Sequence, residues 1–155
     1  MISTVYIGLG SNVGDRERFL MTALEALDAH ADIEVSQVSS LLSNPAVASY
    51  PQPEFINAVA ELKTVLTPQE LLVIFQQLEK DAGRLSKGTN DPRTLDIDIL
   101  LYNDQIICTD DLMIPHPMMH ERYFVLKPLA EIAPQVIHPL LHTSIDDLLD
   151  ARMGL

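Results

Sequence analysis

The residues best suited to chemistry in this sequence are two aspartates, Asp96 and Asp98, in the segment TLDIDILLY. Side chains of a strand alternate between its faces, so a strand here directs both carboxylates to one face and Leu95, Ile97 and Ile99 into the core. Carboxylates roughly 6–7 Å apart along a strand repel each other at neutral pH unless cations lie between them. Such oxygen ligands suit Mg²⁺ held jointly with substrate phosphates. The alternative is a solvated polar face of an edge strand.

Positive charge gathers just before this pair. Four of the ten Lys and Arg residues fall within fourteen positions, namely Lys80, Arg84, Lys87 and Arg93. The chain as a whole carries a net charge of -12, so this local concentration indicates a site for a metal-bridged polyanion such as a nucleotide polyphosphate. Ordinary ion pairing on a helix end and a loop explains the cluster equally well.

The histidines offer two further possibilities. His116 lies between two prolines, and together with Arg122 it could donate hydrogen bonds to phosphate. His116 and His120 have the spacing of two zinc ligands on a helix, but the intervening proline makes a continuous helix improbable and favours the phosphate alternative. His138 and His142 have the same spacing with a proline between them, and we expect them to be surface or partly buried polar residues.

Two familiar nucleotide signatures are absent or weak. No GxxxxGK[ST] motif occurs, which excludes a Walker-type loop. The segment GLGSNVG at residues 8–14 imitates a dinucleotide fingerprint, but its third glycine comes one residue too late. We expect Gly8, Gly10 and Gly14 to bracket a turn, with Ser11 and Asn12 as turn or cap residues.

Composition sets the broad class. A chain of 155 residues with 47% hydrophobic residues predicts one domain over 1–155. Its acidity argues against nucleic acid or an anionic membrane as a partner. No apolar run could span a membrane, the N-terminus lacks the features of a secretory signal, and the single Cys108 cannot form an internal disulfide. We therefore expect a cytoplasmic protein.

Periodicity and turn residues predict the order β-α-β-β-α-β. The predicted elements are strands at 4–9, 33–42, 55–65 and 94–102, a helix at 15–29, a loop at 43–53, and a helix from a capping box at Thr67–Glu70 to Gly83. A short strand or turn near 105–108, a proline turn at 114–117 and two helical segments follow, the last opened by Ser144. This order predicts an α+β, ferredoxin-like antiparallel sheet with both helices on one face and a C-terminal extension.

Three motifs resemble one known family over nearly the whole chain. They are GLGSN at 8–12, DPRTLDIDIL at 91–100 and IPHP at 114–117, and they resemble the 6-hydroxymethyl-7,8-dihydropterin pyrophosphokinases of folate biosynthesis. The resemblance implies a ferredoxin-like core and Mg²⁺-dependent transfer of the β,γ-diphosphate of ATP to the hydroxymethyl group of a reduced pterin, with AMP released. We also expect the protein to be a monomer.

The same resemblance assigns the candidate site residues. Two Mg²⁺ ions would bind Asp96 and Asp98, and the catalytic cations would be Arg84 and Arg93. We add Lys87 as a catalytic cation, because as a point charge it could replace a loop arginine that this chain lacks. ATP would contact Gln76, Glu79, Arg84, Arg93, Ile99, His116 and Arg122, and the pterin would contact Asn44, Pro45, Phe55, Asn57, Asp96 and Phe124.

The chain departs from the family pattern in the loop before the aspartates. Ser86 stands where members commonly carry arginine, Thr89–Asn90–Asp91 stands where a tryptophan is usual, and Asp111 replaces an arginine found in some members. These departures predict weakened loop closure over ATP. The alternatives are a paralogue that binds a pterin or nucleotide without efficient transfer, and a ferredoxin-like regulatory module without a Mg²⁺ site.

Overall fold

The central element is an antiparallel sheet, seen in a computed structural model that describes residues 1–44, 53–83 and 94–154. Its main path runs β2-β4-β1-β5, and the short strand β3 pairs with β4. The strands are β1 (Ser3–Ser11), β2 (Ile33–Val38), β3 (Leu42–Asn44), β4 (Phe55–Thr64) and β5 (Asp96–Tyr102).

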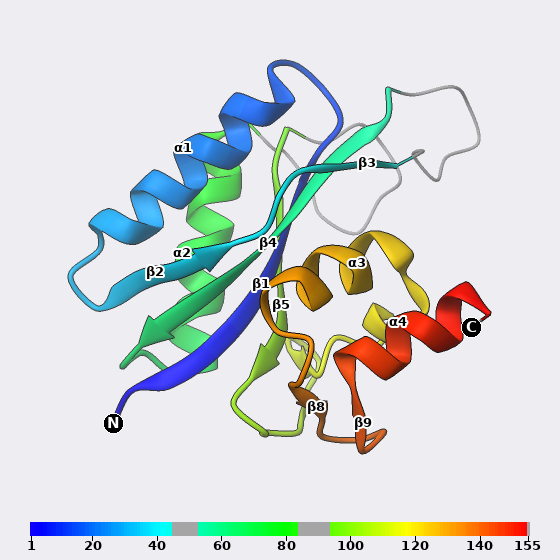
Figure 1. The fold of residues 1–155 in the computed structure, drawn as a ribbon. Coiled ribbons are helices and arrows are strands. Elements are labelled where there is room, and N and C mark those ends of the chain that lie inside the picture. Colours follow the sequence, from blue (N-terminus) through cyan, green and yellow to red (C-terminus); the bar gives the residue numbers. More distant parts are fainter. Residues whose placement is uncertain (45–52, 84–93, 155) are drawn as a thin grey trace.

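Helices α1 (Arg16–Ala29) and α2 (Pro68–Asp81) pack on one face of this sheet (Figure 1). The Asp15 side chain caps α1 by accepting from the backbone N–H of Arg18, and Thr67 and Glu70 form the predicted capping box of α2. The element order and the sheet order confirm the ferredoxin-like α+β core.

The core on this face follows from strand alternation. Leu95, Ile97 and Ile99 are buried as predicted, and they belong to one apolar cluster with side chains of β1 and both helices. That cluster includes Val5, Ile7, Leu9, Leu20, Leu24, Leu27, Leu71 and Phe75. Both strand faces are thereby assigned, because residues that alternate with these must point to the opposite side of the sheet.

Most of the C-terminal extension covers that opposite side (Figure 1). Tyr6, Val59 and Leu101 pack there against Leu129 and Ile145. The first part of the extension does not cover it, because Ile107, Leu112 and Ile114 pack with the α1/α2 cluster. The extension comprises β6 (Ile107–Cys108), β7 (Met113–Ile114), a short 3-10 helix (Met119–Glu121), α3 (Tyr123–Ile132), β8 (Ile137–His138), β9 (Thr143–Ser144) and α4 (Ile145–Met153). Ser144 caps α4 as predicted, accepting from the Asp147 N–H. The single domain over 1–155 stays a prediction.

The strand expected at 33–42 is wrong in its extent. It ends at Val38 because Ser39 turns its backbone and side chain to β4, with its N–H donating to the Val59 carbonyl and its Oγ accepting from the Val59 N–H. The chain resumes as β3, so Ser43 and Asn44 lie in a strand and not in the expected loop. The rest of that loop, residues 45–52, lies outside the described residues.

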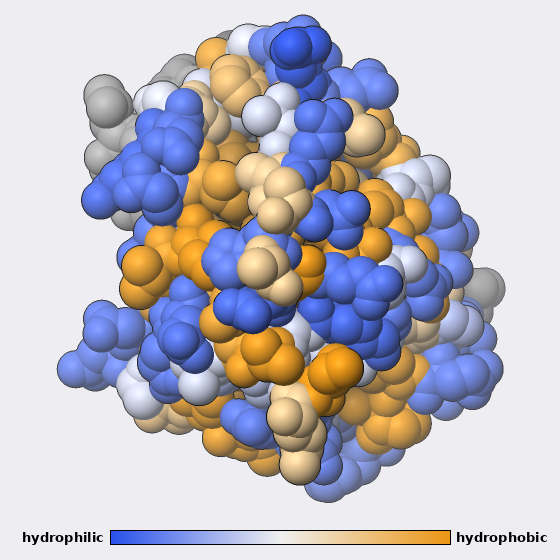
Figure 2. Space-filling view, turned by 90° about the vertical axis from the view of Figure 1, so that its left-hand side faces the viewer, coloured by the Kyte–Doolittle hydropathy of each residue, from blue (hydrophilic) through white to orange (hydrophobic). Residues whose placement is uncertain are grey.

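Hydrophilic side chains are spread across the face that carries α1 and β2, with hydrophobic ones interspersed among them (Figure 2). Across residues 1–44, 53–83 and 94–154, no helix has the length and apolar character needed to cross a membrane.

His138 is fully buried, at 3% exposure, which corrects the expectation of a surface or partly buried residue. Its Nδ1 accepts hydrogen bonds from the backbone N–H groups of Leu140 and Leu141, at 3.2 and 3.1 Å. Burial, and then the proximity of His120, lowers the pKa of His138 from 6.5. The folded state therefore favours the neutral ring that can accept both bonds.

This burial predicts a pH-dependent stability. Below pH 6.5 the unfolded chain binds a proton at His138 that the folded chain resists, so the free energy of unfolding should fall as the pH drops from 6.5 toward the lowered pKa. We expect thermal melts to lose about 3 °C across that window, equivalent to about 1 kcal/mol. In His138→Asn, Oδ1 replaces Nδ1 as acceptor without titrating, so the variant should show a flatter profile. A profile as steep as that of the wild type would contradict this assignment.

Candidate active site

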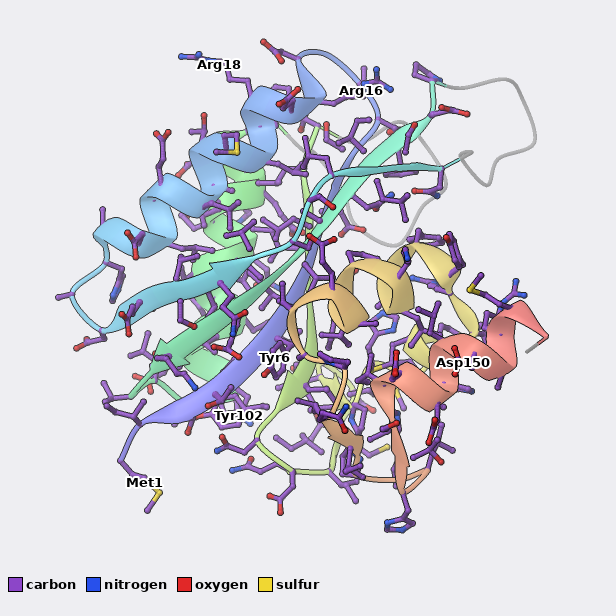
Figure 3. The ribbon with its side chains drawn as sticks, in the orientation of Figure 1. Met1, Tyr6, Arg16, Arg18, Tyr102 and Asp150 are labelled. Atoms are coloured by element: carbon purple, nitrogen blue, oxygen red, sulfur yellow. The ribbon has the colours of Figure 1, made fainter. Side chains whose placement is uncertain are left out.

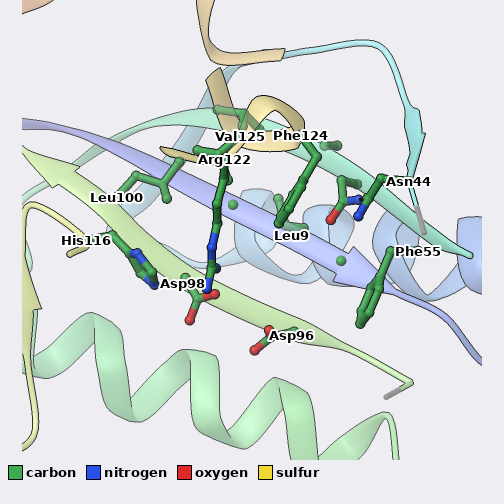
Figure 4. A pocket seen from close by; sticks show the side chains of 15 residues that line it. Leu9, Asn44, Phe55, Asp96, Asp98, Leu100, His116, Arg122, Phe124 and Val125 are labelled. Carbon is green, nitrogen blue, oxygen red and sulfur yellow. Dashed lines mark hydrogen bonds between the residues drawn. The ribbon is translucent and has the colours of Figure 1, made fainter. Parts of the chain in front are cut away.

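A cavity of about 350 Å³ lies between the sheet and the start of α3 (Figure 4). Four strands and the α3 segment contribute to its wall. The lining residues are Gly8, Leu9, Gly10, Asn44, Phe55, Asn57, Ala58, Val59, Asp96, Asp98, Leu100, His116, Arg122, Phe124 and Val125. The site thus unites segments from both ends of the chain.

Strand register builds the cavity floor from two parallel rows. In one row Gly10 lies between Asn57 of β4 and Asp96 of β5, and in the next Gly8 lies between Val59 and Asp98. The expectation that Gly8 and Gly10 bracket a turn is therefore wrong, because both lie within β1. Only the Gly14 part of that prediction holds, since its φ of 74° suits the turn before α1.

Glycine in the middle of each row leaves the floor open. A Cβ atom built on Gly10 would lie 2.9 Å from Oδ1 of Asn57, too close without a shift, whereas one on Gly8 would make only ordinary contacts with Leu100. The next row is filled, because Tyr6 lies there and its hydroxyl donates to Glu61 Oε2 at 2.6 Å (Tyr6 is labelled in Figure 3). The cavity thus coincides with the glycine rows.

The Tyr6–Glu61 pair is held by matched hydrogen bonds. Burial alone would raise the pKa of Glu61, but donors on Tyr6, Ser36 and Gln37 and the charge of Lys63 outweigh it, so the pKa is lowered. Burial and the carboxylate raise the pKa of Tyr6. Since neither side chain is among the cavity-lining residues, this pair closes one end of the floor without entering the site.

One end of the cavity is charged. Asp96 and Asp98 are half-buried and line the cavity together, which confirms that they share a face. Figure 4 shows the side chains of His116 and Arg122 directed toward Asp98. His116 accepts from the Met118 N–H through Nδ1, so the proton of the neutral ring lies on Nε2, where it can be donated.

Backbone contacts fix the two donors of this end. The His116 N–H donates to the Leu100 carbonyl of β5 at 3.0 Å, and the Arg122 carbonyl accepts from Val125 and Leu126 at the start of α3. The Arg122 guanidinium carbon lies 5.7 Å from the centroid of the Phe124 ring. Both donors are therefore anchored by the elements that form the wall.

The other end is aromatic and amide-bearing. Phe55, Phe124 and Asn44 lie at the side of the cavity away from His116 (Figure 4). The Asn57 amide nitrogen donates to the Asn44 side-chain oxygen, linking β4 to β3. Aromatic faces beside polar amides suit a flat heterocycle that stacks with its faces and hydrogen-bonds through its edge.

Several predicted site residues lie elsewhere. Gln76 is exposed on α2, and Ile99 is buried in the α1/α2 core; neither is among the cavity-lining residues. Glu79 is buried, and its Oε2 accepts from the Ile97 N–H at 2.9 Å. Pro45, Arg84, Lys87 and Arg93, with the departures at 86 and 89–91, lie outside the described residues.

The cavity floor and part of its wall were not predicted from the sequence. Val59 could have been found, because it alternates with Phe55 and Asn57 along one strand. Gly8 and Gly10 gave a turn signal that the strand pairing of β1 overrides, and Leu100 and Val125 carried no signal beyond hydrophobicity.

The donor set fits magnesium better than zinc. Two half-buried carboxylates lie beside His116 and Arg122, which can donate hydrogen bonds to phosphate. This set matches Mg²⁺, which proteins commonly hold through one or two carboxylates plus substrate phosphates. Among the described residues there is no group of three His, Cys, Asp or Glu side chains placed to hold a metal without substrate. His120 faces His138, with ring centroids 6.2 Å apart, so it forms no such group with His116.

Solved structures share this fold. A crystal structure of wild-type Plasmodium falciparum HPPK-DHPS with pteroate superposes with a TM-score of 0.77 over 99% of this chain, at 15% sequence identity. This chain spans 43% of that protein. At this identity the likeness establishes the fold alone.

Sequence comparison then identifies the family. Residues 6–134 match the 7,8-dihydro-6-hydroxymethylpterin-pyrophosphokinase (HPPK) family, and this chain belongs to it. The chain is 48% identical to the 2-amino-4-hydroxy-6-hydroxymethyldihydropteridine pyrophosphokinase of Bacillus subtilis, covering 88% of this chain and 81% of that protein. It is 45% identical to the enzyme of the same name from Aquifex aeolicus, covering 90% and 86%. The predicted enzyme class, an ATP-dependent diphosphotransferase of folate biosynthesis, is thereby confirmed.

Proposed function

We propose that this chain transfers diphosphate from ATP to 6-hydroxymethyl-7,8-dihydropterin within the cavity over Gly8 and Gly10. The hydroxymethyl oxygen attacks the β-phosphorus, the bond from that phosphorus to the α-phosphate oxygen breaks, and AMP leaves while the hydroxyl proton is lost. The observation that carries the proposal is the division of one cavity into a charged end and an aromatic end.

The charged end suits the triphosphate. His116 Nε2 and the Arg122 guanidinium can donate to phosphate oxygens. Hydrogen bonds fix the backbone at both residues, and the Arg122 guanidinium lies against the Phe124 ring. We propose that Asp96 and Asp98 would hold two Mg²⁺ ions. When bound, Mg²⁺ neutralises phosphate charge and favours in-line displacement. The same proposal gives contacts with ATP to Gln76, Ile99, Arg84 and Arg93. It makes Arg84, Lys87 and Arg93 the catalytic cations, and it gives Pro45 a contact with the pterin.

The aromatic end suits the pterin. Phe55 and Phe124 offer ring faces, while Asn44 and Asn57 offer amides for the ring edge. Asp96 shares the floor row of Asn57, so a pterin stacked there would lie beside the proposed metal ligands. This adjacency would place the hydroxymethyl group near the triphosphate, which is the main requirement for the reaction.

We further propose that the enzyme works as a cytoplasmic monomer. The described lining residues all come from one chain, so a second copy is not needed to build this part of the site. The free, exposed Cys108 suits a reducing compartment.

The pterin assignment predicts a selective effect of Phe124→Ala. Loss of one stacking face should raise the KM for the pterin by about 10-fold, with a small change in the KM for ATP. The adjacent Tyr123 is exposed and does not line the cavity, so Tyr123→Ala is the matched control and should leave both constants near wild type. Steady-state kinetics with each substrate varied would measure this. An equal rise in both KM values for Phe124→Ala would contradict the assignment.

A further inference from the structure

Glu79 is a buried charged residue that the cavity lining does not include. It projects from α2, on the side of the sheet opposite the cavity, and its exposure is only 4%. Burying a carboxylate is costly unless hydrogen bonds compensate. One of those bonds is defined: Oε2 accepts from the backbone N–H of Ile97 at 2.9 Å.

The hydrogen bond from the Ile97 N–H to Glu79 lies next to the two aspartates of the site. Ile97 lies between Asp96 and Asp98, and its own side chain is buried among the α1/α2 core. Among the described strands β5 pairs only with β1, so its other edge depends on lateral contacts. Two such contacts are Glu79 to the Ile97 N–H and the His116 N–H to the Leu100 carbonyl.

We infer that Glu79 is a positioning residue, which fixes the β5 backbone between the two aspartates and so sets the spacing and direction of their carboxylates. A buried backbone N–H needs an acceptor, and the Glu79 carboxylate supplies one to Ile97. Groups that orient metal ligands in this way typically change metal affinity or activity 10–100-fold when they are removed. This inference rests on the proposed function, in which Asp96 and Asp98 bind Mg²⁺.

Three substitutions separate the effect of the length of the Glu79 side chain from the effect of its charge. Glu79→Gln keeps an acceptor oxygen at the same distance without the charge, Glu79→Asp keeps the charge but withdraws it by one methylene, and Glu79→Leu removes both. A positioning role predicts that Gln stays near wild type, Asp loses about 10-fold and Leu loses 10–100-fold in affinity for Mn²⁺. Glu25, exposed on α1, provides the matched control Glu25→Leu, which should behave as wild type.

The test combines metal binding with a direct probe of the amide. Mn²⁺ would be titrated by calorimetry in the presence of α,β-methylene-ATP, and exchange of the Ile97 amide would be followed by NMR in the protein without ligands. We expect faster Ile97 exchange in the Leu and Asp variants, protection close to wild type in the Gln variant, and an unchanged KM for the pterin.

Three results would overturn the inference. The first is wild-type metal affinity and Ile97 protection in a folded Glu79→Leu or Glu79→Asp protein. The second is a Gln variant weaker than the Asp variant, since charge would then matter more than reach. The third is an equal loss of nucleotide affinity with and without metal, which would make Glu79 a direct nucleotide contact. Failure of the proposed function is distinguishable, because wild-type protein would then release no AMP while its Ile97 amide still reported on Glu79.

Discussion

Replacing either Asp96 or Asp98 with asparagine should lower kcat by about 10³-fold or more while leaving the fold intact. Each substitution keeps size and hydrogen-bonding capacity but removes one carboxylate from the pair that faces the charged end of the cavity. Catalysis of phosphoryl-type transfer depends on positioning and on neutralising charge, and losing a single electrostatic contributor of this kind costs about 10²–10³-fold. Loss of half of a two-carboxylate metal site should cost at least the upper value.

The expected loss should also depend on metal. Higher Mg²⁺ should restore part of the activity if the variants are weakened mainly in metal binding. Asp104 is exposed in the turn after β5 and is the matched control, so Asp104→Asn should retain wild-type kinetics and metal dependence. Thermal melts would establish that all three proteins are folded. An Asp96→Asn protein with wild-type turnover at saturating Mg²⁺ would remove Asp96 from the metal site.

Gly10→Ala should lower kcat/KM for the pterin by about 10–100-fold. The added Cβ would meet Asn57 Oδ1 at 2.9 Å, and Asn57 cannot move freely because its amide nitrogen donates to Asn44. Displacing that amide would leave the pterin edge without its partner, and an unpaired buried polar group costs about 1–3 kcal/mol.

Gly8→Ala is the control for this effect, since it adds the same methyl group to the same strand and the same floor. Its Cβ would lie 3.6 Å from Leu100, an ordinary contact, so we expect the KM for the pterin to change by less than about threefold. If Gly8→Ala and Gly10→Ala were equally impaired, a general weakening of β1 would explain both results and the contact with Asn57 would not.

The sheet core and the aspartate pair could be predicted because both follow from local periodicity. Alternation along 94–102 places Ile97 and Ile99 in the core and both carboxylates opposite, and the structure has this arrangement. The capping box at Thr67 likewise marks the start of α2 through a purely local exchange of hydrogen bonds.

The cavity floor could not be predicted in the same way, because it depends on the pairing of distant strands. Gly8 and Gly10 are turn residues by local propensity, yet pairing with Val59 and Asn57 keeps them in a strand. The buried role of Glu79 depends on α2 lying beside the edge of β5 that faces away from β1, and the burial of His138 depends on its turn packing close to His120. Such contacts between segments leave little trace in the sequence of either segment.

The central claim is tested most directly by AMP release from ATP, measured with 6-hydroxymethyl-7,8-dihydropterin present or omitted and with Mg²⁺ or excess chelator. We predict AMP only when both the pterin and Mg²⁺ are present, with one pterin diphosphate formed for each AMP. ADP as the product, or AMP at the same rate without the pterin, would contradict diphosphate transfer in this cavity. Tight pterin binding without AMP release would instead identify a protein that has kept the aromatic end of the site but lost the transfer reaction.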